Sequence, residues 1–164
     1  MTINRKAGVR NNPILLVDDN PDDVVFTLRA FAGNEFDNEI IVANSGIAAL
    51  DLLLPDNGDP PLQPVIVLLD LDMPRVSGLE VLQRLRSNPL TQLLTIIMLT
   101  TSNEERDITE SYRLGANSFI RKSLTLADFV DAARIIGTYW LTMNEHARPQ
   151  IPRGHSHPHT QPLS

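Results

Sequence analysis

Short apolar runs alternate along the chain with longer stretches of helical periodicity. The apolar runs predict strands over residues 13–18, 39–43, 65–70, 93–100 and 118–120. The periodic stretches predict helices over residues 20–31, 45–54, 77–88, 102–115 and 124–146. A strand that is followed each time by a helix favours a parallel sheet, because every crossover must return to the same sheet edge. We therefore expect an α/β fold with a five-stranded parallel sheet and five helices.

Two of the predicted helices carry an apolar face that can be named. The first begins with Asn20 as N-cap and Pro21 at its first position. Its apolar face is predicted to hold Val24, Val25, Leu28 and Phe31. The last helix is predicted to be long, with its apolar positions at Phe129, Ala133, Ile136, Trp140 and Met143.

Composition and charge exclude several classes of protein. The net charge of −6 argues against a general nucleic-acid or membrane-surface binder, and the absence of cysteine excludes disulfides and thiolate chemistry. No run approaches the roughly 18 apolar residues of a membrane span, and the polar start does not resemble a secretory signal. We expect a cytoplasmic protein with a flexible segment over 1–11, one domain over 12–146 and a Pro- and His-rich tail over 147–164.

Polar side chains stand at four of the predicted strand ends. Asp18 and Asp19 follow the first strand, Asp70 ends the third, Thr100 ends the fourth and Lys122 follows the fifth. Each has an ordinary explanation on its own, such as a helix cap, a turn, a strand residue or a solvated lysine. In a parallel sheet, however, all of them lie along one edge, so the set predicts a site that the single residues do not.

Carboxylates that converge repel one another unless a cation lies between them, and Mg²⁺ prefers oxygen ligands. A metal held by Asp18, Asp19 and Asp70 leaves an Asp70 oxygen available as a nucleophile. Lys122 and Thr100 can then contact the oxygens of an incoming phosphoryl group. The pattern predicts a magnesium-dependent phosphoryl-transfer site.

Four motifs in this order resemble the receiver domain of two-component response regulators. They are VDD (17–19), LLDLDMPRVSG (68–78), MLTTS (98–102) and FIRK (119–122). The resemblance covers about residues 12–146. It implies a flavodoxin-like doubly wound fold, with the strands in the order 2-1-3-4-5.

The resemblance also implies a role for each acidic residue. Asp70 matches the phosphoacceptor, which takes its phosphoryl group from a phosphohistidine on a sensor kinase. Asp18 and Asp19 match the pair that binds Mg²⁺, and residue 72 supplies a backbone carbonyl to the metal. Such a domain is a signalling protein and not a turnover enzyme, apart from its own dephosphorylation.

Three further positions match the parts of the family that read phosphorylation. Lys122 matches the lysine that pairs with the phosphoryl group, Thr100 the switch hydroxyl and Phe119 the aromatic switch position. The resemblance implies that the surface formed by the fourth helix, the fifth strand and the fifth helix changes on phosphorylation.

The sequence departs from the family at three places. Asp72 stands where asparagine is common, so we expect stronger metal dependence or an altered phosphoryl lifetime. Ser123 follows Lys122 where proline is usual, so this peptide bond is expected to be trans. Phe119 lacks the hydroxyl of the usual tyrosine, so its burial should depend on packing alone.

The partners are expected from the same resemblance. The Lys-Ser pair, the Pro-rich 55–64 loop and the aromatic pair Tyr139-Trp140 are similar to small receivers that work with bacterial phytochromes. This implies a phytochrome-type histidine kinase and a regulator without an output domain. We also expect a homodimer built on the last helix, with Phe129, Tyr139, Trp140 and Met143 at or near its surface.

A phosphatase of the haloacid-dehalogenase type is the alternative. Its nucleophile motif also has two acids at a strand end, which would make Asp70 the nucleophile and Asp72 the acid/base. Pro74 and the position of the acidic pair before the nucleophile strand argue against this alternative.

Overall fold

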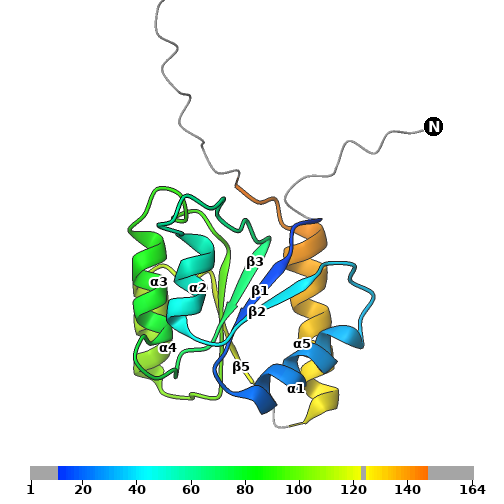
Figure 1. The fold of residues 1–164 in the computed structure, drawn as a ribbon. Helices are drawn as coiled ribbons and strands as arrows, with labels where there is room; N and C mark the ends of the chain where they lie inside the picture. Colours follow the sequence, from blue (N-terminus) through cyan, green and yellow to red (C-terminus); the bar gives the residue numbers. More distant parts are fainter. Residues whose placement is uncertain (1–10, 123–124, 148–164) are drawn as a thin grey trace, which may run out of the picture.

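The computed structural model describes residues 11–122 and 125–147, which form a central parallel sheet between two layers of helices (Figure 1). The strands are β1 (Ile14–Val17), β2 (Ile40–Ala43), β3 (Ile66–Leu69), β4 (Ile96–Thr100) and β5 (Ser118–Arg121). The helices are α1 (Pro21–Ala32), α2 (Gly46–Leu53), α3 (Gly78–Arg86), α4 (Glu105–Arg113), α5 (Leu126–Ile136) and the π-helix η2 (Gly137–Met143).

The sheet has the order β2-β1-β3-β4-β5, and all its strand pairs are parallel. This confirms the predicted fold class and strand order. The chain runs from β1 outward to β2 and then crosses to β3 on the other side of β1. The order therefore reverses between β1 and β3, which is where ligand sites form in open α/β sheets.

The strands are apolar on both faces because helices cover both. Alternate residues of β1, such as Leu15 and Leu16, lie in two separate cores. The first core packs under α2 and α3, and the second under α1 and α5. Figure 1 shows α2, α3 and α4 on one side of the sheet and α1 and α5 on the other.

The predicted starts of α1 and α2 are confirmed by their caps. The Asn20 side chain accepts hydrogen bonds from the amides of Asp22 and Asp23 at 2.9 and 3.3 Å. Ser45 caps α2 in the same way, through the amide of Ala48 at 3.0 Å. These bonds satisfy amides that the first helical turn leaves without partners.

The apolar face of α1 includes the predicted Val24 and Phe31 but not Val25. Val25 is 48% exposed, whereas Thr27 is 1% exposed and Ala30 and Phe31 are buried. The periodicity favoured Val25 because it is apolar, but the helix packs on the sheet and α5 through the face that carries Thr27 and Ala30. Hydrophobic periodicity counts apolar residues, so it assigned the apolar Val25 to the buried face and overlooked the polar Thr27.

Two other elements differ from their predicted bounds. β4 begins at Ile96 and not at residue 93, because residues 90–93 form a turn in which Leu93 is 54% exposed. α4 spans Glu105–Arg113, shorter than the predicted 102–115, and Ser111 is its buried residue.

The long last helix is not α-helical throughout. After Ile136 it continues as η2, whose wider turn moves the buried positions to Gly137 and Leu141. Met143, predicted on the apolar face, is therefore 66% exposed. A Cβ on Gly137 would lie 1.9 Å from the ring of Phe36, so only glycine fits at the start of this segment.

None of the helices in the described part of the chain is long and apolar enough to cross a membrane. The predicted flexible segment, apart from Asn11, and the tail, apart from Ala147, lie outside the described residues. The same holds for the expected trans bond between Lys122 and Ser123.

The inner face of α1 gives the first testable prediction. The Thr27 hydroxyl is buried and has no hydrogen-bond partner among the described residues. Thr27→Val keeps the shape and removes this group, so it should raise the free energy of unfolding by about 1 kcal/mol.

Urea unfolding measures the change. Val25→Thr exchanges the same two side chains at an exposed position of the same helix, and it should change stability by less than about 0.5 kcal/mol. A Thr27→Val protein that is no more stable than the parent would show that the hydroxyl is satisfied.

Candidate functional site

The sheet itself brings the acidic strand ends together. Val17 and Leu69 are register partners at the ends of β1 and β3, so Asp18 and Asp70 follow on adjacent strands. The amide of Asp70 donates to the carbonyl of Val17 at 2.9 Å, which extends the ladder by one more bond. The two carboxylates are thus placed by backbone hydrogen bonds at the point where the strand order reverses.

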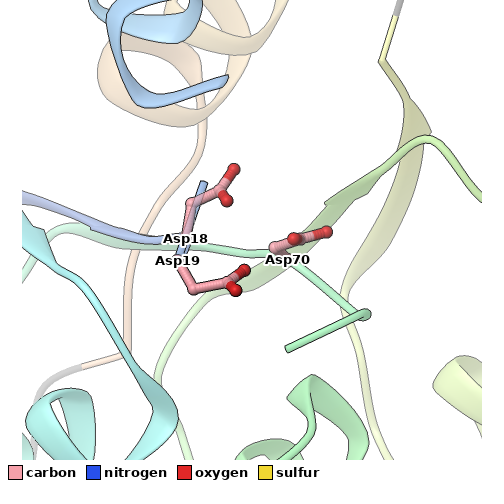
Figure 2. Close-up of side chains that lie close together, drawn as sticks. All are labelled: Asp18, Asp19 and Asp70. Atoms are coloured by element: carbon pink, nitrogen blue, oxygen red, sulfur yellow. The ribbon is translucent and has the colours of Figure 1, made fainter. Parts of the chain in front are cut away.

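Asp18, Asp19 and Asp70 form one acidic cluster (Figure 2). One carboxylate oxygen from each lies within 4.8 Å of the others. Asp18 and Asp70 are 1% and 7% exposed, while Asp19 is exposed. Three hard oxygen donors at this spacing, two of them buried, fit a divalent cation that takes oxygen ligands.

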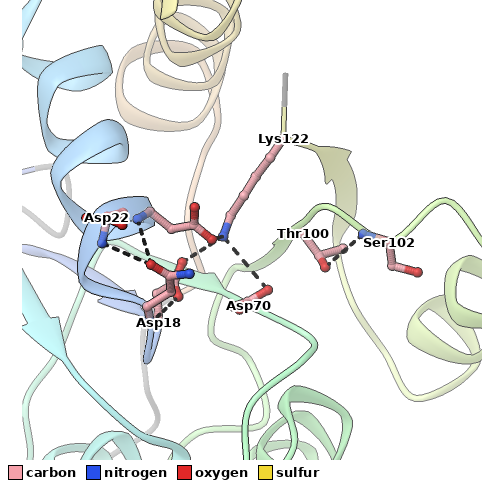
Figure 3. Close-up of polar contacts among 8 residues, drawn as sticks. Asp18, Asp22, Asp70, Thr100, Ser102 and Lys122 are labelled. Carbon is pink, nitrogen blue, oxygen red and sulfur yellow. Dashed lines mark hydrogen bonds and ion pairs between the residues drawn. The ribbon is translucent and has the colours of Figure 1, made fainter. Parts of the chain in front are cut away.

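Lys122 is the positive charge of the site. Its ammonium donates to Asp18 Oδ2 at 2.7 Å and to Asp23 Oδ2 at 3.1 Å, and it lies 3.9 Å from Asp70 Oδ1 (Figure 3). The backbone amide of Lys122 donates to the carbonyl of Thr100 at 2.8 Å, which fixes this residue beside the end of β4. Sequence reasoning placed Lys122 in the site but missed Asp23.

The electrostatics of the site are dominated by burial. Burial raises the pKa of Asp70 to about 6, and the negative charges of Asp18 and Asp72 add to the rise. Lys122 and the amide of Leu71 oppose it without cancelling it. For Lys122, burial lowers the pKa, but its hydrogen bond to Asp18 and the charges of Asp70 and Asp18 outweigh burial and leave the pKa raised. The ammonium therefore stays charged at neutral pH.

The segment after β3 is held against the backbone of Asp70. The amide of Gly78 donates to the carbonyl of Leu71 at 2.9 Å, and a Cβ on Gly78 would lie 2.1 Å from the carbonyl oxygen of Asp70. Any side chain at position 78 would push α3 away from the site. Asp72, within this loop, has an exposed side chain. Its predicted role as a carbonyl ligand stays a prediction.

Thr100 lies at the same sheet edge but faces the next loop. It is 0% exposed, and its hydroxyl accepts a hydrogen bond from the amide of Ser102 at 3.2 Å. The Ser102 hydroxyl in turn donates to Asp107 on α4 at 2.5 Å (Figure 3 shows Thr100 beside Ser102). Among the described residues, no hydrogen bond joins Thr100 to Asp70. The two residues therefore lie at the same edge of the sheet without a direct bond between them.

Phe119 lies on the edge strand β5, where its register partner on β4 is Met98, two residues before Thr100. Its side chain is half-buried and packs against the core under α2 and α3. Its backbone amide donates to the Tyr112 hydroxyl on α4 at 3.2 Å. The backbone of the aromatic position is therefore in contact with Tyr112, in the last turn of α4.

Together these groups can perform one kind of chemistry. A buried carboxylate, an acid cluster that fits a divalent cation and a fixed ammonium suit transfer of an anionic group to Asp70. Asp23 and Ser102 were missed because each acts through a neighbour. The only sequence signal for Asp23 was its position in the first turn of a helix that begins at the site.

Comparison with known proteins agrees with this geometry. The sequence matches the response regulator receiver domain family over residues 14–134. It is 33% identical over 129 residues to the response regulator Rcp1 of Synechocystis sp., an alignment that covers 78% of this chain and 88% of that protein.

Solved structures give the same result. The phosphorylated cyanobacterial phytochrome response regulator RcpA superposes with a TM-score of 0.75 at 30% identity, over 84% of this chain and 99% of that one. The Mn²⁺-bound form of Rcp1 has a TM-score of 0.75 at 31% identity and the same coverage. The bacteriophytochrome response regulator AtBRR has a TM-score of 0.61 at 40% identity, over 82% of this chain and 98% of that one.

The acidic cluster predicts a measurable effect on stability. The folded protein binds a proton on Asp70 more tightly than the unfolded chain does, because the pKa rises from 3.8 to about 6. The wild type should therefore lose stability as the pH rises through this window, and the loss should be complete above it. Asp70→Asn avoids the loss and should be more stable by about 1–3 kcal/mol above the window, in the absence of metal.

Urea unfolding in chelator, at pH values on both sides of the window, measures this difference. Asp56→Asn, in the exposed 55–64 loop, removes the same charge away from the site and should have little effect at either pH. Equal stability of wild type and Asp70→Asn at neutral pH would contradict a destabilised carboxylate.

Proposed function

Because the chain belongs to the response regulator receiver domain family, we propose that Asp70 accepts a phosphoryl group from a sensor histidine kinase and that the added charge alters a binding surface. A phosphoacceptor role is general to receiver domains, which are signalling proteins. The observation that carries the proposal for this chain is the buried Asp70 carboxylate beside Lys122, in an acid cluster at the reversal of strand order. The phosphatase alternative has no comparable support, since the family match covers both the nucleophile strand and the acidic pair.

The residues present fit a Mg²⁺ ion. Asp18, Asp19 and Asp70 would hold it, with the backbone carbonyl of Asp72 as a further oxygen ligand. When bound, the ion neutralises part of the acid cluster and of the phosphoryl charge. The Mn²⁺-bound form of Rcp1 supports a divalent cation in a relative with the same fold.

The chain's own residues account for the transfer. An Asp70 oxygen attacks the phosphorus of a phosphohistidine, the new O–P bond forms and the P–N bond breaks, with its electron pair left on the imidazole nitrogen. The Lys122 ammonium lies 3.9 Å from Asp70 Oδ1, so it can pair with an oxygen of a phosphoryl group on Asp70. Burial of Asp70 and Lys122 keeps water from screening this pairing.

The switch uses Thr100 and Phe119. A phosphoryl group adds strong acceptor oxygens next to the Thr100 hydroxyl, which then exchanges its bond from the Ser102 amide for a bond to phosphate. That change frees the Ser102 amide and disturbs the Ser102–Asp107 contact on α4. Phe119 can rotate into the space that Thr100 leaves. The surface formed by α4, β5 and α5 is the part that a partner would read.

A phytochrome-type histidine kinase is the proposed phosphodonor, in the cytoplasm where such kinases act. Support comes from the relatives: RcpA is described as a cyanobacterial phytochrome response regulator, and AtBRR as a bacteriophytochrome response regulator. The net charge of −6 is unfavourable for general binding to DNA, so we propose a protein partner downstream.

The homodimer is proposed on the outer face of α5 and η2. Ile135, Tyr139 and Met143, spaced four residues apart, are 61%, 48% and 66% exposed and form one apolar stripe. Phe129, which sequence reasoning included in this surface, is 0% exposed and stacks on Phe26 in the core, so it is not available to a partner. Trp140 is half-buried and contacts Tyr139 edge to face.

Phosphotransfer profiling tests the main proposal. In the presence of Mg²⁺, a phosphorylated phytochrome-type kinase should transfer label to the wild type within minutes, and Asp70→Asn or chelator should reduce transfer to background. Asp56→Asn should behave as wild type. Multiple turnover of a phosphatase substrate that is lost on Asp72→Asn would instead favour the phosphatase.

Sedimentation velocity tests the dimer. At micromolar concentration the wild type should sediment as a dimer, and Tyr139→Glu should shift it to a monomer because a charge would be buried in the interface. Leu90→Glu, at a position that is 54% exposed elsewhere, is the control and should leave the dimer intact. A monomeric wild type, with and without beryllofluoride, would refute the proposal.

A further inference from the structure

Lys122 contacts two acids more closely than it contacts the proposed phosphoacceptor. We propose that Asp23 is a positioning residue that holds the Lys122 ammonium away from Asp70 and so sets how readily the site takes up a phosphoryl group. This inference rests on the proposed function of Asp70 and adds to it a residue outside the acidic cluster.

The distances define the competition. The ammonium is 2.7 Å from Asp18 and 3.1 Å from Asp23, both within hydrogen-bond range, and 3.9 Å from Asp70, which is outside it. Lys122 has three donors, and its side chain is 5% exposed, so little water is available to replace a lost partner. A closer approach to Asp70, or to a phosphoryl group on it, must weaken one of the two existing bonds.

Asp23 is the partner that can be given up. The Asp18 side chain is 1% exposed and its other oxygen accepts from the amide of Asn20 at 3.0 Å, so in the metal-free site releasing it would leave a buried charge unpaired. With Mg²⁺ bound, Asp18 would be a ligand of the ion and would stay in place. The Asp23 carboxylate is 36% exposed and can turn to water instead. The Lys122–Asp23 bond is therefore the weaker one, because water can solvate its acid when the bond breaks.

The position of Asp23 is fixed by the cap of α1. The Asn20 side chain accepts from the amides of Asp22 and Asp23, which sets the first turn of the helix beside the end of β1. In this turn Asp23 reaches Lys122, whereas its neighbour Asp22 is exposed and forms no ion pair with Lys122 among the described residues. The chain thus offers two adjacent aspartates of equal charge, one in contact with the lysine and one not.

Removing the charge of Asp23 should help phosphorylation in two ways. Lys122 would lose its ion pair with Asp23 and could move closer to Asp70. The site would also carry one negative charge fewer, which would reduce the repulsion of an anionic phosphodonor. With acetyl phosphate as donor, an O–P bond to Asp70 forms, the O–P bond of the donor breaks and acetate leaves with its electron pair. Asp23→Asn should raise the rate of this reaction and the affinity for beryllofluoride by about three- to tenfold.

The experiment compares Asp23→Asn with Asp22→Asn and Asp23→Glu at saturating Mg²⁺. Asp22→Asn removes the same charge from the same turn and should change rate and affinity less than twofold. Asp23→Glu keeps the acid and should return both values toward wild type. The ¹⁵Nζ signal of Lys122 in NMR spectra should shift in Asp23→Asn and not in Asp22→Asn, which reports the loss of the Lys122–Asp23 bond. The higher affinity for beryllofluoride in Asp23→Asn alone is the readout that a merely structural role of Asp23 would not produce. Urea unfolding of each variant separates the effect from a change in stability.

The outcomes distinguish the two proposals. A wild type that takes up no phosphoryl group or beryllofluoride would overturn the proposed function and this inference with it. A wild type that is phosphorylated normally, with equal values for Asp23→Asn and Asp22→Asn, would overturn the inference alone. A higher rate and affinity in Asp23→Asn only, together with the shifted Lys122 signal, is the expected result.

Discussion

The whole site depends on one buried ammonium placed among carboxylates at the edge of a parallel sheet. Without Lys122, Asp18 and Asp70 would be two unpaired negative charges in a nearly dry position, which no stable fold tolerates at low cost. The hydrogen bond from Lys122 to Asp18 compensates one of them. Burial raises the pKa of Asp70, and the Lys122 ammonium at 3.9 Å only partly offsets this rise. Because Lys122 makes its hydrogen bonds to other acids, the Asp70 carboxylate remains available for chemistry.

This arrangement trades stability for function. An asparagine at position 70 would suit the metal-free fold better than the aspartate does, because the charge is desolvated and lies near two other acids. The negative charges that destabilise the Asp70 carboxylate also favour binding of a cation at the acidic cluster. Asp23 refines the balance, since it adds a second, solvent-accessible partner for the lysine. In the unphosphorylated protein the Lys122 ammonium thus lies close to Asp70 but is hydrogen-bonded to Asp18 and Asp23.

The fold was predictable to the extent that its signals were local. Strands such as Ile66–Leu69 are apolar at every position because both faces of the sheet are covered, and Asn20 and Ser45 mark helix starts through their own side-chain bonds. The errors came where packing overrode the pattern. Val25 was placed inside although the helix turns it outward, and the π-helix moved Met143 to the surface beside the close contact of Gly137 with Phe36.

The sequence by itself determined the order of strands and helices and the presence of polar residues at four strand ends, since both depend on residue type and spacing along the chain. Only the tertiary structure decided which acids share the lysine, because Lys122 lies 104 residues from Asp18 and 99 from Asp23 along the chain and meets them through sheet register and a helix cap. It also decided that the Thr100 hydroxyl accepts a hydrogen bond from Ser102, and that the buried Asp70 carboxylate has no cation within hydrogen-bond distance among the described residues. The lysine lies 2.7, 3.1 and 3.9 Å from the three acids, and in a buried site such differences in distance set these preferences. No pattern along a chain encodes them directly.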